Sequence, residues 1–144
     1  MKIHQISLFI ENRKGQLRIP TQILAEAGIN IRTLSLADTE QFGILRLIID
    51  DWQKAKEVLE KAGCVVKVAE VIAVKVPDRP GRLDELLATI EDAGLNIEYM
   101  YAFTFGREDK PIMFFRFEDA DAAAKALTAR GINLVSGEDL YQTD

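Results

Sequence analysis

The sequence has few of the side chains on which most catalytic and metal sites depend. Its 144 residues include one cysteine (Cys64), one histidine (His4) and three serines. A lone cysteine cannot form an intramolecular disulfide or a cysteine-rich zinc site, and a lone histidine excludes a three-histidine metal site. The groups used in nucleophilic catalysis are therefore nearly absent. We expect no catalytic residues, no metal site and no cofactor.

Positive charge is also scarce. The 18 lysine and arginine residues are outnumbered by 23 aspartates and glutamates, which gives a net charge of −5 and an isoelectric point of about 5.0. Proteins that bind nucleic acids concentrate lysine and arginine on one surface, so we expect no nucleic-acid partner. The sequence also lacks the run of roughly 18 apolar residues that a membrane-spanning helix needs, and its first residues do not resemble a secretory signal. We expect a cytoplasmic protein with no membrane partner.

The sequence does contain an internal repeat. A shift of 66 residues aligns residues 12–17 (NRKGQL) with 78–83 (DRPGRL), and residues 27–31 (AGINI) with 93–97 (AGLNI). Two separate blocks that agree at one offset indicate a duplicated unit. Further along, the offset is 68, so the second copy carries two extra residues, which we expect in a hairpin turn.

Each copy predicts the order strand, helix, strand, strand, helix, strand. Apolar residues alternate along the strands and recur every three or four residues along the helices, as at Leu83, Leu86, Leu87 and Ile90. The paired strands are predicted at residues 30–37 and 42–49 in the first copy and at 96–105 and 112–117 in the second. This order predicts an α+β fold of two ferredoxin-like βαββαβ units, with antiparallel sheets and helices on one face. We expect the domains to span residues 1–69 and 70–144.

The join between the copies has no turn residue. Residues 65–76 contain only Lys67, Glu70 and Lys75 among apolar side chains. This segment must supply the last strand of the first copy and the first strand of the second. Because strands are usually about five or six residues long, we expect a bend near Ala69 or Glu70.

The repeated pattern resembles the ACT domain family. Its strongest form lies in residues 78–83, Asp-Arg-Pro-Gly-Arg-Leu, followed by Gly-Leu-Asn-Ile at residues 94–97; the first copy differs mildly, with Asn12 in place of the acid and Lys14 in place of proline. The resemblance covers the whole chain, twice, and is closest to the free-standing tandem ACT proteins of bacteria. It implies a small-molecule sensor of amino-acid metabolism, with a free amino acid as its ligand.

The two glycine loops, residues 12–17 and 78–83, also favour an amino-acid ligand on physical grounds. A glycine between strand and helix lets a ligand approach the backbone, and the first N–H groups of the helix favour a carboxylate. A side chain such as Asp78 or Asn12 can accept a hydrogen bond from an ammonium group. The resemblance adds the two asparagines, and the tyrosines could line an apolar side chain. The candidate ligand-binding residues are Asn12, Arg13, Gly15, Gln16, Leu17, Asn30, Asp78, Arg79, Gly81, Arg82, Leu83, Asn96, Tyr99 and Tyr101.

Purely structural interpretations of these residues stay open. Glycine is the usual turn residue at a strand–helix corner, and Asn30 and Asn96 could serve only to fix the turn after each helix. Arg13 and Arg79 could be solvated surface charges. The Tyr99 and Tyr101 pair could belong to the core or to a subunit interface.

We therefore expect a non-catalytic, amino-acid-binding regulatory protein. Its open sheet edges and aromatic strand faces favour a homodimer. An alternative is a dissociable regulatory subunit that docks on an amino-acid biosynthetic enzyme, for example of the acetolactate synthase type. A remote alternative is a small acylphosphatase-like enzyme, although the loops lack its phosphate-cradling run of residues.

Overall fold

The computed structural model describes residues 2–38, 40–104 and 111–142, and it divides into two compact units. The N-terminal unit comprises His4–Ala69. The C-terminal unit begins at Glu70 and includes the first residues of the chain, up to Ile3. Lys2 explains this grouping, because its ammonium group lies 2.6 Å from the carboxylate of Glu70 and 2.8 Å from that of Asp121. We keep residues 1–69 and 70–144 as the proposed domains.

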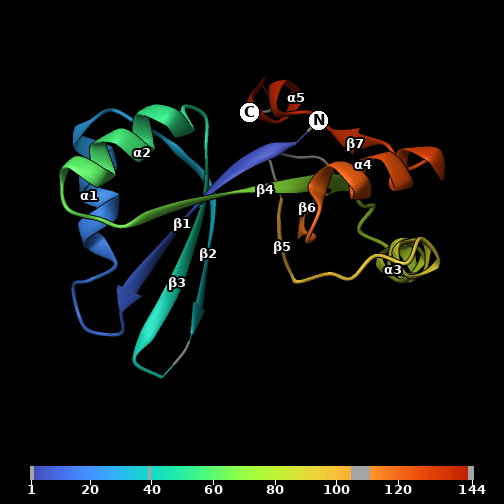
Figure 1. Ribbon diagram of the computed structural model, residues 1–144, viewed down its shortest axis with the longest axis horizontal. Coiled ribbons are helices and arrows are strands. Elements are labelled where there is room, and N and C mark those ends of the chain that lie inside the picture. The colour runs from blue at the N-terminus through green and yellow to red at the C-terminus, as the bar shows by residue number, and fades with distance from the viewer. Residues whose placement is uncertain (1, 39, 105–110, 143–144) are drawn as a thin grey trace. The chain divides into compact units, whose positions relative to one another are not determined.

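The N-terminal unit contains the predicted order of elements (Figure 1). Its strands and helices are β1 (Ile3–Glu11), α1 (Arg18–Glu26), β2 (Ile31–Asp38), β3 (Phe42–Ile49), α2 (Trp52–Lys61) and the first part of β4 (Val66–Lys75). The strands lie in the order β2-β3-β1-β4, and β3 is antiparallel to both of its neighbours. This is the ferredoxin-like arrangement.

The C-terminal unit repeats the arrangement and adds a short helix. It contains the second part of β4, α3 (Arg82–Asp92), β5 (Tyr99–Phe103), β6 (Ile112–Arg116), α4 (Ala120–Ala129), β7 (Leu134–Val135) and α5 (Gly137–Gln142). The strand order is β7-β4-β6-β5, with every pair antiparallel. The α+β class with ferredoxin-like units is confirmed.

Each unit buries one face of its sheet beneath its first two helices. In the N-terminal unit, Ile6, Leu8 and Leu45 from the strands pack with Leu24 of α1 and Leu59 of α2. The corresponding core of the C-terminal unit is formed by Ile72, Val74, Phe115, Leu86, Ile90, Ala123 and Leu127. The helices therefore lie on one face of each sheet, as the periodicity of the sequence predicts.

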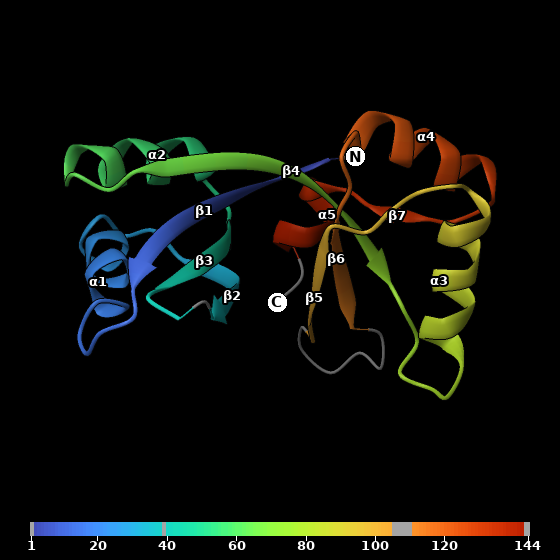
Figure 2. The ribbon, with the colours of Figure 1, turned by 60° about the horizontal axis from the view of Figure 1, so that its bottom comes forward.

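Two strand predictions are corrected. The segment expected to supply two strands forms a single one, since β4 runs unbroken from Val66 to Lys75, through the positions Ala69 and Glu70, and is drawn as one ribbon in Figure 2. The strand expected at residues 96–105 begins only at Tyr99. Its predicted end, Phe105, and most of the predicted turn before Pro111 lie outside the described residues. The segment before Tyr99 instead places Leu95 and Ile97 against the core, which satisfies their hydrophobicity without strand pairing.

The second helix of each unit begins at an aspartate. Asp51 precedes α2 and accepts a hydrogen bond from the backbone N–H of Lys54 (3.2 Å), and Asp119 precedes α4 and accepts one from Ala122 (3.0 Å). Each carboxylate satisfies an N–H group for which the helix has no carbonyl partner. Among the described residues, no helix is long and apolar enough to span a membrane.

We predict that Asp119→Ala lowers the free energy of unfolding by about 1 kcal/mol, because it removes this cap. Asp119→Asn should retain most of the stability, since the amide oxygen can accept the same bond. Urea unfolding followed by circular dichroism measures both values. Equal stability of the alanine variant and the unchanged protein would contradict the capping role.

Candidate functional site

The strand–helix loop of the N-terminal unit is held by hydrogen bonds of its own backbone. Arg13 N–H donates to the carbonyl of Glu11 (2.8 Å), and Gln16 N–H donates to the carbonyl of Arg13 (3.2 Å). Gly15 has a φ of 87°, in the left-handed region that glycine adopts without steric cost. The guanidinium group of Arg13 lies 2.6 Å from the carboxylate of Glu11, so it forms an exposed ion pair.

The loop of the C-terminal unit repeats these bonds at the equivalent positions. Arg79 N–H donates to the carbonyl of Pro77 (2.9 Å), and Arg82 N–H donates to the carbonyl of Arg79 (3.3 Å). Gly81 has a φ of 86° and directly precedes α3, where its carbonyl accepts a bond from Glu85 N–H (3.0 Å). The two copies of the repeat therefore form the same turn, although Lys14 of the first loop is replaced by Pro80 in the second.

These bonds revise which N–H groups could meet a ligand. From the sequence, that role is expected for the backbone N–H groups at the start of each first helix, which are those of Gln16, Leu17, Arg82 and Leu83. Gln16 and Arg82 already donate within their turns. Leu17 and Leu83 lie at the start of α1 and α3, where a helix provides no carbonyl partner.

A cavity of about 240 Å³ lies at the first loop. It brings together three of the predicted residues, Asn12, Arg13 and Leu17. The remaining lining residues are Ile10, Glu11, Leu36 and Gly43. The loop of the N-terminal unit is therefore hollowed where the sequence predicts a ligand.

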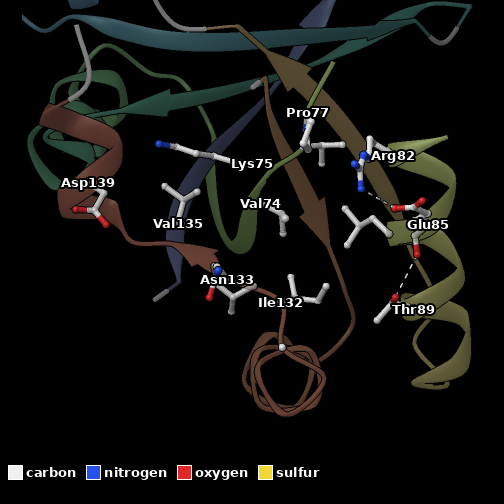
Figure 3. A pocket seen from close by; sticks show the side chains of 14 residues that line it. Val74, Lys75, Pro77, Arg82, Glu85, Thr89, Ile132, Asn133, Val135 and Asp139 are labelled. Atoms are coloured by element: carbon white, nitrogen blue, oxygen red, sulfur yellow. Dashed lines mark hydrogen bonds and ion pairs between the residues drawn. The ribbon is translucent and has the colours of Figure 1, made fainter. Parts of the chain in front are cut away.

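A larger cavity, of about 780 Å³, lies in the C-terminal unit between α3 and the segment of β7 and α5 (Figure 3). Of the predicted residues, only Arg82 lines it. Its other polar lining residues are not among those predicted from the sequence; they are Lys75, Glu85, Thr89, Asn133 and Asp139. Glu85 and Thr89 follow Arg82 at helical spacing and could have been found by that pattern. Asp139 could not, because it belongs to a helix that the repeat does not contain.

The two asparagines are not brought to the loop of their own unit. Asn30 follows the C-terminal end of α1 and Asn96 follows that of α3, and both are exposed. The nine residues of α1 and eleven of α3 place each asparagine about 13 to 16 Å from the glycine loop along the helix axis. Neither asparagine lines either cavity.

The two tyrosines lie on the half-buried strand β5. The ring of Tyr101 stacks on Phe114, with 5.3 Å between ring centroids. Met100, between the tyrosines, packs against the core beneath α3 and α4. Because successive side chains of a strand point to opposite faces, Tyr99 and Tyr101 lie on the face away from these helices.

The single histidine and the single cysteine of the chain both pack against neighbouring parts of the protein. The imidazole ring of His4 stacks on Trp52, with 4.4 Å between centroids. Cys64 is partly buried, and this burial raises the pKa of its thiol, which keeps it protonated and weakly nucleophilic. Among the described residues, no three histidine, cysteine, aspartate or glutamate side chains gather in a way that could hold a metal ion.

We predict that Gly81→Ala lowers the free energy of unfolding by about 1 kcal/mol, because residues with a Cβ atom are strained at positive φ. A Cβ atom there would meet no atom of the chain within 4 Å, so the cost comes from the backbone alone. Gly81→Asn should cost less, since asparagine tolerates this region. Equal losses in both variants, measured by urea unfolding, would contradict a purely conformational cause.

Comparisons with known proteins agree with this fold. The model of the ACT domain pair matches residues 1–143. A crystal structure of a Bacteroides thetaiotaomicron protein is 32% identical, covers 99% of this chain and 97% of its own, and superposes with a TM-score of 0.90. The ligand-free regulatory subunit of aspartate kinase from Thermus thermophilus is 20% identical over 90% of this chain and 93% of its own, with a TM-score of 0.64. No curated protein matches the sequence. The chain belongs to the ACT domain pair family.

Proposed function

We propose that the chain is a non-catalytic regulatory protein that senses a free amino acid. The observation that carries the proposal is the repeated strand–glycine–helix loop, which has the same backbone bonds and the same positive φ in both units of an ACT domain pair. ACT domains are regulatory domains. The fold likeness to regulatory subunits of aspartate kinase supports the same role.

The two loops offer complementary partners for an α-amino acid. The first N–H groups of α1 and α3 and the positive end of each helix dipole favour a carboxylate. Asn12 and Asp78 are both exposed at the same position of their loops, where their oxygen atoms can accept hydrogen bonds from an ammonium group. Asn30, Asn96, Tyr99 and Tyr101 would complete such a site only from a neighbouring copy, because they lie away from the loop of their own unit.

Ligand binding would act by stabilising one arrangement of the two units, or of two chains, over another. We propose a homodimer. A biosynthetic enzyme is a second proposed partner, and the observation that favours it is the likeness in fold to the regulatory subunits of aspartate kinase from two Thermus species.

A thermal-shift screen of the twenty amino acids tests the sensing role. A ligand present at 100 times its dissociation constant stabilises the native state by about 2.7 kcal/mol, which corresponds to a rise of several degrees in the melting temperature. Asp78→Ala should weaken the response, whereas Asp92→Ala removes the same charge at the other end of α3 and should not. No response to any amino acid at millimolar concentration would contradict the proposal.

Sedimentation velocity tests the homodimer. We expect a species of twice the 16.2 kDa mass of the chain at micromolar concentration. A single species of 16.2 kDa, with and without amino acids, would contradict it.

A further inference from the structure

The 780 Å³ cavity of the C-terminal unit differs from the glycine loops in position and composition. β7 pairs with β4 only opposite Ala73 and Val74. Beyond this pairing, the cavity is lined by residues 74–77, which are the end of β4 and the two residues after it. Its walls therefore come from the end of β4 and the residues after it, α3, the segment before β7, β7 itself and α5. Its volume is within the range of roughly 300–1,000 Å³ that small-molecule sites occupy.

The cavity presents charges of both signs around an apolar centre. Figure 3 shows Lys75 and Asp139 on one side and Arg82 and Glu85 on the other, with Val74 and Ile132 between them. A ligand with charge of one sign would be attracted by two of these side chains and repelled by the other two. A ligand that carries both an ammonium and a carboxylate group can place the ammonium near an acidic side chain and the carboxylate near a basic one on the same side of the cavity.

The chain fixes the backbone of one of the charged residues and pairs two others with each other. Asp139 N–H donates to the hydroxyl oxygen of Ser136 (3.0 Å), and the next residue, Leu140, is fully buried, which fixes α5 at the edge of the cavity. The guanidinium group of Arg82 lies 3.3 Å from the carboxylate of Glu85 one turn further along α3. The cavity is therefore partly organised before a ligand binds.

The repeat shows that these polar residues are particular to the second copy. At the offset of 66 residues, Lys75, Glu85 and Thr89 correspond to Phe9, Ile19 and Ile23. At the offset of 68 residues, Asn133 corresponds to Val65. Every polar residue of this set has an apolar counterpart in the first copy. Three of the counterparts are exposed, at 58% for Phe9, 47% for Ile19 and 72% for Val65, so burial in a core does not explain the difference.

We propose that this cavity is a ligand site, present in the C-terminal unit alone, for a zwitterion with an apolar body. Such a ligand is either a large apolar amino acid or a short apolar peptide, and the two share the same terminal groups. The proposal rests on the proposed sensing function and deepens it, because it places the recognised ligand in a cavity of which only Arg82 belongs to the glycine loops.

The repeat itself supplies the test variant. Glu85→Ile, Thr89→Ile and Asn133→Val, combined in one chain, replace three of the polar lining residues by their counterparts in the first copy, which the same fold accepts at those positions. Ala88→Gln is the matched control, since it introduces the exposed counterpart Gln22 on α3 outside the cavity. Circular dichroism and thermal melting establish that each variant is folded.

Isothermal titration calorimetry with leucine, phenylalanine and the dipeptide Leu-Leu measures binding, and N-acetylleucine and isoamylamine each remove one of the two charges. We expect at least one zwitterion to bind, the single-charge analogues to bind about tenfold more weakly or worse, and the triple variant to lose a similar factor. Ala88→Gln should bind like the unchanged protein. Binding of leucine or phenylalanine identifies an amino-acid ligand, and binding of Leu-Leu alone identifies a peptide.

Three outcomes would overturn the proposal. Unchanged affinity in the triple variant together with loss of binding in Asp78→Ala would place the ligand at the glycine loop, and the sensing function would stand. If N-acetylleucine bound as tightly as leucine, the site would not require a zwitterion. Failure of all three zwitterions to bind would exclude this ligand class, and the screen of twenty amino acids would then decide the sensing function separately.

Discussion

The structure of each unit depends on burying one face of a four-stranded sheet beneath two helices. Side chains such as Leu45 and Phe115 are fully removed from water, and burial of this kind provides the main favourable free energy of folding. This burial requires that the two helices lie over the centre of the sheet. Both cavities lie at the ends of strands, where Ile10 and Glu11 of β1 line the smaller one and Val74 and Lys75 of β4 line the larger one.

Much of this arrangement could be predicted from the sequence. The spacing of Leu83, Leu86 and Ile90 predicts α3 because one face of that helix must be apolar, and the structure confirms it. The repeat predicts two equivalent units for the same reason, since each copy carries its own apolar faces. The start of β5 could not be predicted, because Leu95 and Ile97 can be buried either in a strand or in the irregular segment that the structure shows.

The candidate site could be predicted less well than the fold. A glycine at a strand–helix corner is visible in sequence, and the positive φ of Gly15 and Gly81 follows from it. The polar wall of the larger cavity could not be found in this way, because its members come from separate elements that meet only after folding. Lys75 and Asn133 are far apart in sequence and reach the same cavity through the pairing of β7 with β4.

The shortness of β7 has a dynamic consequence. Only two residue pairs join it to β4, whereas β1 and β3 of the N-terminal unit pair along seven. Segments with few backbone hydrogen bonds open at low free energy, and their amide protons exchange with solvent sooner than those of a sheet centre. The amide protons of β7 should therefore exchange with solvent sooner than those of β1 and β3, although the buried side chains of Leu134, Val135 and Leu140 hold the segment against the unit.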